Sequence, residues 1–301
     1  MECLRENGIP SLNFVEVEID DKFYFETTCE NGHRTITLLQ AEKFEMLFES
    51  GSMAMIDGYY REAISSIASS VERFHEFCLK VVSIHHNMDK DEFNNIWNNM
   101  KNQSERQLGA FYYMYLSEFK IAPPKFIEKN AAFRNSVIHK GYIPNRDEAY
   151  KYIEEAYKYI IDILKILKTQ YGDSISKLTL MNLKNAIPIN NKLPVSTMAG
   201  LSILGLISHG NECLAKPFSQ ALKELEEKNK FLRKHYESLA TIKEDNDIKI
   251  FTHIDDEIII RAHYDVETGE ILGFYPSNIQ YSHIPAPVVD LTMAGGFAKT
   301  R

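Results

Sequence analysis

The spacing of apolar residues changes near residue 41, and this change constrains the fold more than any other feature of the chain. Apolar side chains recur every three or four residues from Phe44 to Cys78, which predicts amphipathic helix. The same spacing returns in three later segments, at residues 108–119, 125–139 and 146–168. We therefore predict a mainly α fold in which residues 41–170 form an antiparallel helical bundle.

Residues that typically end or begin helices divide this region. Gly51-Ser52 is expected to break or kink the first long segment, and Pro123-Pro124 is expected to stop the helix that precedes it. Asp91 is the expected N-cap of a shorter helix that runs through Trp97. Gly141 is expected to close the helix of residues 125–139 in the left-handed conformation. The bundle should thus contain four to six helices.

The first forty residues carry the alternation of apolar and polar side chains that is typical of half-buried strands. Turn-forming residues separate three such segments. We predict that residues 1–40 form a small N-terminal β element, a three-stranded meander with strands at Phe14–Ile19, Phe23–Thr27 and Thr35–Leu39.

Residues 171–301 mix helical and strand patterns. Ser219–Leu239 interleaves glutamate and lysine along an amphipathic helical pattern. Ile258–Tyr264 and Glu270–Phe274 flank a glycine turn, which predicts a hairpin. The tail from Ala294 is expected to be disordered. These residues are therefore predicted to form a C-terminal α+β region, the third part of the chain.

Composition limits the classes of function. The net charge of −8 argues against a protein that coats nucleic acid by its overall field, so contact with nucleic acid must come from a local cluster of cations. Four cysteines without framework spacing predict a reducing compartment. No signal peptide pattern is present, and no apolar run is long enough to span a bilayer. We therefore expect a cytoplasmic protein with no membrane partner.

A cation, an amide and an imidazole lie within six residues at the end of a predicted helix, as Arg134, Asn135 and His139. Asn135 and His139 are four residues apart and share a helix face, so the amide can orient the imidazole. Cleavage of an RNA phosphodiester requires proton transfer, which an imidazole can perform. It also requires stabilisation of the negative charge of the transition state, which a guanidinium can provide. Spacing alone favours a structural interpretation, with a histidine at a helix end and an arginine in a surface ion pair.

The segment from Arg134 to Gly141, followed by a proline loop and a long final helix, resembles the signature of the HEPN family. That signature is arginine, a polar residue, a short spacer and histidine, late in a helical bundle. The resemblance covers residues 41–169. The resemblance implies a metal-independent endoribonuclease that needs no cofactor. It also implies a homodimer in which two copies of Arg134, Asn135 and His139 face each other across a shared cleft.

An earlier helix of such nucleases often adds an acidic or polar residue. Glu72 is the candidate, because a carboxylate among small and apolar neighbours requires a cationic partner. A structural salt bridge, within its own helix or to another helix, explains Glu72 equally well.

A second signal lies in the turn of residues 29–33. Cys29 and His33 flank a glycine, as in half of a zinc knuckle, and Cys3 could join them to hold a structural zinc ion. Four ligands are needed, however, and no second cysteine-rich pair exists. A plain β-turn is therefore favoured over a zinc site.

Two other histidine positions are predicted to be structural. His75 lies on the long helical segment and is expected to pack in the core. His85-His86 falls at a predicted helix end, with no carboxylate or third histidine at ligand spacing, and is expected to be solvated.

The leading hypothesis is a HEPN-type ribonuclease of the toxin or antiphage defence class. Its partners would be RNA, a second copy of the chain, and an antitoxin or regulatory protein. The alternative is a non-catalytic dimeric HEPN module that binds a nucleotide, RNA or a partner protein. A third hypothesis gives the function to the C-terminal hairpin region and leaves the bundle only to dimerise.

Overall fold

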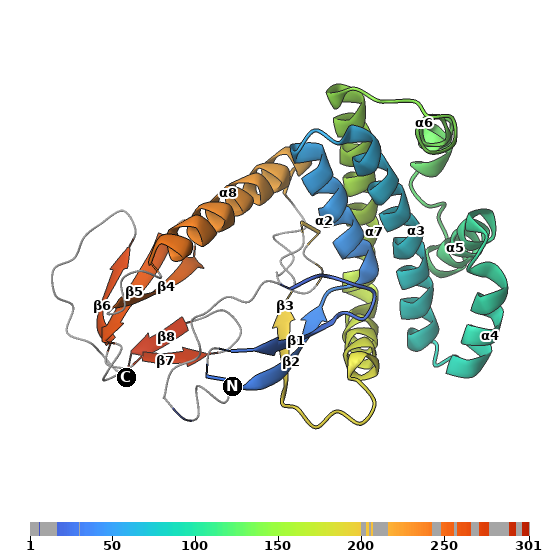
Figure 1. The fold of residues 1–301 in the computed structure, drawn as a ribbon. Coiled ribbons are helices and arrows are strands. Elements are labelled where there is room, and N and C mark those ends of the chain that lie inside the picture. Colours follow the sequence, from blue (N-terminus) through green and yellow to red (C-terminus); the bar gives the residue numbers. More distant parts are fainter. Residues whose placement is uncertain are drawn as a thin grey trace. The chain divides into compact units, whose positions relative to one another are not determined.

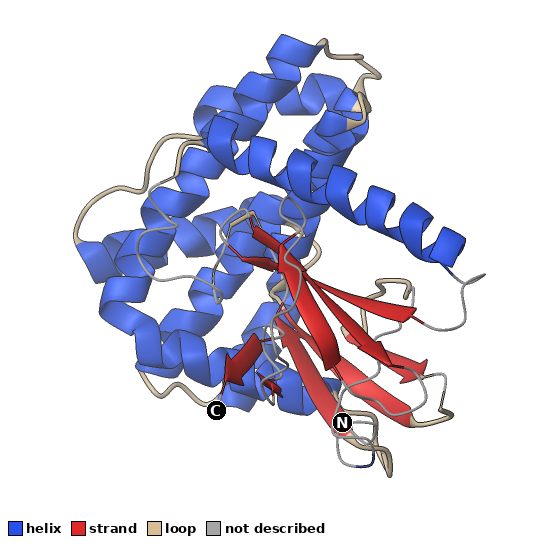
Figure 2. Cartoon of the chain, turned by 90° about the vertical axis from the view of Figure 1, so that its left-hand side faces the viewer, coloured by secondary structure: helices blue, strands red, loops and turns tan. Residues whose placement is uncertain are grey.

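The computed structural model describes residues 6, 17–29, 31–199, 203–204, 206, 216–242, 248–255, 258–265, 271–276, 289–292 and 297–300. Its chain divides into two compact units. The helical unit comprises residues 40–185 and 199–230, and the strand-rich unit comprises residues 1–39, 186–198 and 231–301. Figure 2 distinguishes the helices from the strands. Residues 171–185 therefore group with the bundle, beyond the boundary predicted at residue 170.

The fold is mainly helical, as the sequence predicts, and the helices follow one another along the chain (Figure 1). Their bounds are α2 Lys43–Ile56, α3 Tyr60–His85, α4 Lys90–Met100, α5 Ser104–Phe119, α6 Ile127–His139, α7 Arg146–Ala186 and α8 Phe218–Ile242. Among the described residues, no helix combines the length and the apolarity that crossing a membrane requires.

The strands of the described residues form three small sheets. The first has the order β1 Tyr24–Thr28, β2 Arg34–Gln40, β3 Val195–Ala199; the second has the order β4 Ile248–Asp255, β5 Ile258–Asp265, β6 Ile271–Pro276; the third pairs β7 Val289–Thr292 with β8 Phe297–Thr300. The predicted hairpin is confirmed as β5 and β6, which pair in antiparallel register.

The N-terminal sheet is three-stranded, but the predicted meander is wrong about residues 17–19 of its first strand, whereas its second and third strands are confirmed as β1 and β2. Residues 17–19 adopt no regular structure, and residues 14–16 lie outside the described part of the chain. β3 supplies the missing strand: the Ile36 N–H donates to the Pro194 carbonyl at 2.9 Å. The prediction of a disordered tail is also wrong for residues 297–300, which form β8.

Helix α3 is the central element of the helical unit, because it packs against α2, α5 and α6. Ile64, Ile67 and Phe74 of α3 are fully buried, and they belong to one core cluster with the buried face of α7. Aromatic rings join α7 to its neighbours, for example Phe126 and Tyr159 with ring centroids 5.3 Å apart. Burial of this continuous apolar surface drives formation of the bundle.

The first long helical segment breaks at a different place from the one predicted. α2 ends at Ile56, and the left-handed Gly58 (φ 85°) turns the chain into α3. Gly51 lies inside α2, where a Cβ atom would come within 2.8 Å of the Ile67 side chain and 3.1 Å of the Ala63 carbonyl oxygen. Gly51 therefore allows α2 and α3 to approach closely rather than ending a helix.

The helix termini correct one predicted cap and confirm another. Asp89, not Asp91, is the N-cap of α4, and its side chain accepts from the N–H groups of Asp91 and Glu92 at 2.9 and 3.0 Å. Gly141 has the expected positive φ of 71°. The Tyr142 N–H donates to the Ser136 carbonyl at 3.1 Å, which closes the last turn of α6.

Helix α7 extends past its predicted end near residue 168. Its regular dihedral angles are interrupted at Tyr171 (φ −130°, ψ 28°), after which helix resumes as far as Ala186. Gly172 and Asp173 have low helix propensity, which conceals the continuation in the sequence. Burial of Ile175 and Leu178 in the core stabilises the second part of the helix.

A buried carboxyl group on α2 binds the backbone of Leu206. Glu45 is only 2% exposed. Its side chain accepts from the Glu42 N–H at 2.9 Å, as part of a capping box, and from the Leu206 N–H at 3.0 Å. The first turns of α8 pack nearby in the same core, with Phe218 against Tyr157 at a centroid distance of 5.4 Å.

Candidate functional site in the helical unit

Helix α6 carries three of the four predicted catalytic residues, and its packing determines where they lie. Val137 is the fully buried residue of its last turns. Arg134 lies one turn before Val137, so its side chain starts on the face of α6 that packs against α3. Asn135 and His139 are exposed. The burial of Val137 therefore directs the arginine toward α3 and leaves the imidazole in solvent.

An ion pair joins the two helices at this point. Arg134 Nη2 lies 2.7 Å from Glu72 Oε1 on α3, and the Arg134 Nη1 group donates to Asn135 Oδ1 at 3.2 Å. The sequence predicts a cationic partner for Glu72, and the structure supplies Arg134. The two charged side chains are 28% and 31% exposed. A pair this accessible stabilises the fold by about 1 kcal/mol or less, so its main effect is to orient the guanidinium.

The four predicted catalytic residues line one cavity of about 460 Å³. Glu72 comes from α3, and Arg134, Asn135 and His139 come from α6. The rest of the lining comes from α3, from the α4–α5 connection and from the first turn of α5, and consists of Arg73, Lys101, Asn102, Ser104, Glu105 and Gln107. The volume is in the range of typical small-ligand sites, and the lining is polar throughout.

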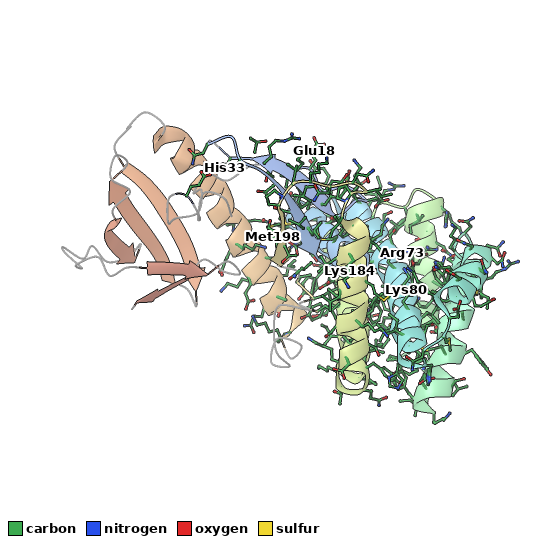
Figure 3. The ribbon with its side chains drawn as sticks, turned by 90° about the horizontal axis from the view of Figure 1, so that it is seen from below. Glu18, His33, Arg73, Lys80, Lys184 and Met198 are labelled. Carbon is green, nitrogen blue, oxygen red and sulfur yellow. The ribbon has the colours of Figure 1, made fainter. Side chains whose placement is uncertain are left out.

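Arg73 and Lys101 are the cations of this cavity that sequence reasoning misses. Arg73 Nη1 lies 2.6 Å from Glu76 Oε2, and its Nη2 group donates to Gln107 Oε1 at 2.9 Å. The Gln107 amide in turn donates to the Lys101 carbonyl at 2.7 Å. Figure 3 labels Arg73 among the side chains of the chain. The only sequence signal for Arg73 is that it directly follows the candidate Glu72 in the chain.

An apolar recess of about 250 Å³ adjoins the polar cavity. The two share the Arg134–Glu72 pair, and the recess is walled by Val71, Leu108 and Tyr152 among others. The ion pair therefore lies between a polar compartment and an apolar one.

His75 lines the apolar recess but is structural, as predicted. Its Nε2 atom lies 2.8 Å from the Tyr159 hydroxyl, and its ring stacks on Phe111 at a centroid distance of 4.3 Å. Burial, with a smaller contribution from the charge of Arg73, lowers the pKa of His75 to about 3. The imidazole is therefore neutral at physiological pH and provides no acid at this site.

Asn135 hydrogen bonds to Arg134 and not to His139. Within the described part of the chain, the His139 imidazole has no hydrogen-bond partner. An orienting role of Asn135 toward His139 stays a prediction, whereas Asn135 does hold the guanidinium together with Glu72. The exposed imidazole is free to rotate toward a bound ligand.

The turn of Cys29 and His33 is a tight β-turn that leads into β2. The Cys29 N–H donates to the His33 carbonyl at 3.0 Å, and the Gly32 N–H donates to the Cys29 carbonyl at 2.9 Å. His33 Nε2 lies 2.9 Å from a carboxylate oxygen of Glu6. Over the residues that are described, no group of three or more histidine, cysteine or acidic side chains could hold a metal ion. Cys3 lies outside those residues, so the zinc site stays a prediction.

The other predicted histidine pair, His85-His86, is exposed at the end of α3. His86 Nε2 lies 2.8 Å from Glu118 Oε1, and the His85 ring contacts that of Tyr171 at a centroid distance of 4.5 Å. This pair therefore links α3 to α5 and α7 at the surface.

Comparisons with known proteins add no relative. No family model, no curated protein and no solved structure matches this chain. The function must therefore be argued from the site itself.

Proposed function

We propose that this protein is a metal-independent endoribonuclease of the HEPN type that acts as a homodimer. The observation that carries the proposal is the shared cavity: Glu72 on α3 and Arg134, Asn135 and His139 on α6 line one polar space, although the sequence separates the two groups widely. A cation held by a carboxylate beside a solvent-exposed imidazole suits the charge and the proton movements of phosphodiester cleavage.

In the proposed reaction the RNA 2′-oxygen attacks the adjacent phosphorus, and the bond from phosphorus to the 5′-oxygen breaks. His139 of one subunit takes the proton of the 2′-hydroxyl, and His139 of the second subunit gives a proton to the leaving 5′-oxygen. Arg134 donates paired hydrogen bonds to the non-bridging oxygens as charge develops on them. The products are a 2′,3′-cyclic phosphate and a 5′-hydroxyl, and no protein nucleophile is needed.

The charges of the cavity support a contact with one or two phosphates. Arg73, Lys101 and Arg134 place three cations in the lining, in a chain whose net charge is −8. Glu72, Glu105 and Glu76, the partner of Arg73, balance them until a ligand binds. A cluster of this size selects a local site on an RNA and does not coat a long tract. The adjoining apolar recess has room for a nucleobase next to the phosphate.

The test is RNA cleavage in the presence of EDTA, followed by mapping of 2′,3′-cyclic phosphate ends on total tRNA. Wild-type protein is expected to produce such ends. His139→Ala and Arg134→Ala are expected to lower the rate at least about 100-fold, the usual loss for a general acid–base group. Lys129→Ala is the matched control, because Lys129 is also on α6 but pairs with Glu155 outside the cavity.

Two outcomes would contradict the proposal. Full activity of the His139→Ala dimer would remove the imidazole from the chemistry. Loss of activity of the wild-type protein on addition of EDTA would show that a metal ion is required.

The alternative function is a non-catalytic dimeric module that binds RNA, a nucleotide or a partner protein. The acidic net charge and the internal pairing of Arg134 with Glu72 and Asn135 favour it. Retained RNA binding without any cyclic phosphate ends would support this alternative.

A further inference from the structure

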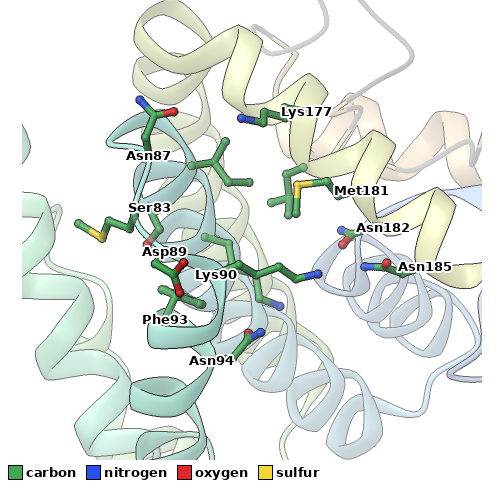
Figure 4. Close-up of a pocket in the computed structure, with 14 residues that line it drawn as sticks. Ser83, Asn87, Asp89, Lys90, Phe93, Asn94, Lys177, Met181, Asn182 and Asn185 are labelled. Carbon is green, nitrogen blue, oxygen red and sulfur yellow. The ribbon is translucent and has the colours of Figure 1, made fainter.

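A cavity of about 500 Å³ lies elsewhere in the helical unit, between the last turns of α3, the first turns of α4 and the last turns of α7. Figure 4 shows side chains from all three helices around it. None of the residues that line it lines the cavity of Arg134 and His139. It is therefore a separate candidate site with a chemistry of its own.

Positive charge dominates the lining of this cavity. Lys80, Lys90 and Lys177 come from three different helices. The only carboxylate in the lining is Asp89, and its Oδ1 atom is already engaged as the N-cap of α4. Glu76, which lies just outside the lining, already balances the charge of Lys80, so the positive charges of Lys90 and Lys177 remain against the single carboxylate of Asp89. The lining thus suits a ligand that carries at least one negative group.

Two of the three lysines are available for such an anion. Lys80 Nζ lies 2.7 Å from Glu76 Oε1. In the part of the chain that is described, Lys90 and Lys177 have no ion-pair partner, and both are exposed. Figure 4 shows Lys90 on α4 and Lys177 on α7 among the side chains that line the cavity. Ammonium groups on flexible stems are well suited to phosphate oxygens.

The rest of the lining combines apolar side chains with asparagine side chains. Ile84, Phe93 and Met181 are partly buried apolar side chains, and Asn185 extends from α7 beside them. A phenyl ring and a thioether provide a surface for a flat ring, and a carboxamide can hydrogen bond to the edge of a base. A ligand that uses all these groups has an anionic end and a flat, hydrogen-bonding body.

We propose that this cavity binds a nucleoside phosphate, with the phosphate held by the lysines Lys90 and Lys177 and the base against Phe93. The volume fits, since sites for ligands of this size range from roughly 300 to 1,000 Å³. The proposal does not rest on the proposed ribonuclease activity, because the two cavities have no lining residue in common.

The test is isothermal titration of the full chain with the four ribonucleoside 5′-monophosphates, the matching nucleosides and inorganic phosphate. At least one monophosphate is expected to bind more tightly than its nucleoside and than inorganic phosphate. In the double variant Lys90→Ala/Lys177→Ala its Kd should rise at least about tenfold, which corresponds to 1.4 kcal/mol. Lys165→Ala, an exposed lysine of α7 outside the cavity, is the matched control and should leave the Kd unchanged.

Two further variants separate the parts of the proposal. Phe93→Ala should weaken binding of the monophosphate and leave binding of inorganic phosphate unchanged, because the ring contacts only the base. His139→Ala should bind the monophosphate as the wild-type protein does, even if RNA cleavage is lost or was never present.

Three results would overturn the proposal. The first is no binding of any monophosphate up to about 1 mM, the weak end of specific affinities. The second is binding that the double lysine variant leaves intact. The third is binding that Arg134→Ala abolishes, which would place the nucleotide in the other cavity. Thermal unfolding of each variant shows that a lost signal reflects the site and not a lost fold.

Discussion

The buried carboxyl group of Glu45 predicts an unusual dependence of stability on pH. Burial raises the pKa of Glu45 from its ordinary value of 4.5 to about 7, although two backbone N–H groups stabilise the charged form. The folded protein therefore keeps the proton over a pH range in which the unfolded chain releases it. The contribution of Glu45 to the free energy of unfolding is fully present below pH 4.5 and is lost as the pH rises through 7.

The size of the effect follows from the two pKa values. Their difference corresponds to about 3 kcal/mol of stability lost between pH 4.5 and pH 8. His75 acts in the opposite direction, because its pKa is lowered from 6.5 to about 3, so its contribution is lost as the pH falls through that range. The two effects oppose each other between pH 4.5 and 6.5. A plot of the stability of the wild-type protein against pH therefore cannot separate them.

The informative quantity is therefore the difference between the wild-type protein and Glu45→Gln. The amide has one acceptor oxygen where the carboxyl group has two, so one of the N–H groups of Glu42 and Leu206 loses its partner, at a cost of about 1–3 kcal/mol at every pH. In urea unfolding followed by circular dichroism, the wild-type advantage should shrink by about 3 kcal/mol from pH 4.5 to pH 8. A difference that is constant, or that grows with pH, would refute the reasoning.

Two further predictions concern the helix contact and the ion pair. Gly51→Ala should destabilise the fold relative to Gly109→Ala by about 1–3 kcal/mol in urea unfolding, because a Cβ atom at Gly51 meets Ile67 whereas one at Gly109 meets no atom within 4 Å; equal effects would contradict the close approach. Glu72→Gln should change stability by less than about 1 kcal/mol but lower the rate of RNA cleavage, measured as cyclic phosphate ends; a large loss of stability with normal cleavage would make the pair purely structural.

The sequence predicts those parts of this fold that depend on local patterns. Apolar spacing is enough to predict helix from Phe44 onward, and the glycine at position 141 is enough to predict the end of α6. The break between α2 and α3 is not predicted, because a glycine within a helix can mark an end or a close contact. At Gly51 the close contact with Ile67 shows that the glycine serves a helix contact and not a helix end, and this contact exists only in the folded chain.

The same limit applies to the third strand of the N-terminal sheet and to the candidate site. Pairing of β2 with β3 joins residues far apart in the chain, and no local pattern encodes such a pairing. Glu72 could be chosen from the sequence because an isolated carboxylate among apolar neighbours needs a cation. Lys101 could not, because it reaches the cavity only through the packing of α5 against α3.

One carboxylate on α3 lies between the two cavities of the helical unit. Glu76 accepts from Lys80 at one oxygen and from Arg73 at the other, at 2.7 and 2.6 Å, and Figure 3 labels both cations. Lys80 lines the lysine-rich cavity, and Arg73 lines the cavity of Arg134. Seven residues, about 10 Å of helix, separate the two cations. An anion that draws Lys80 away from Glu76 leaves that carboxylate to Arg73 alone, and an anion at Arg73 has the converse effect on Lys80. Because such a coupling is reciprocal, occupancy of either cavity would alter the affinity of the other by the same factor.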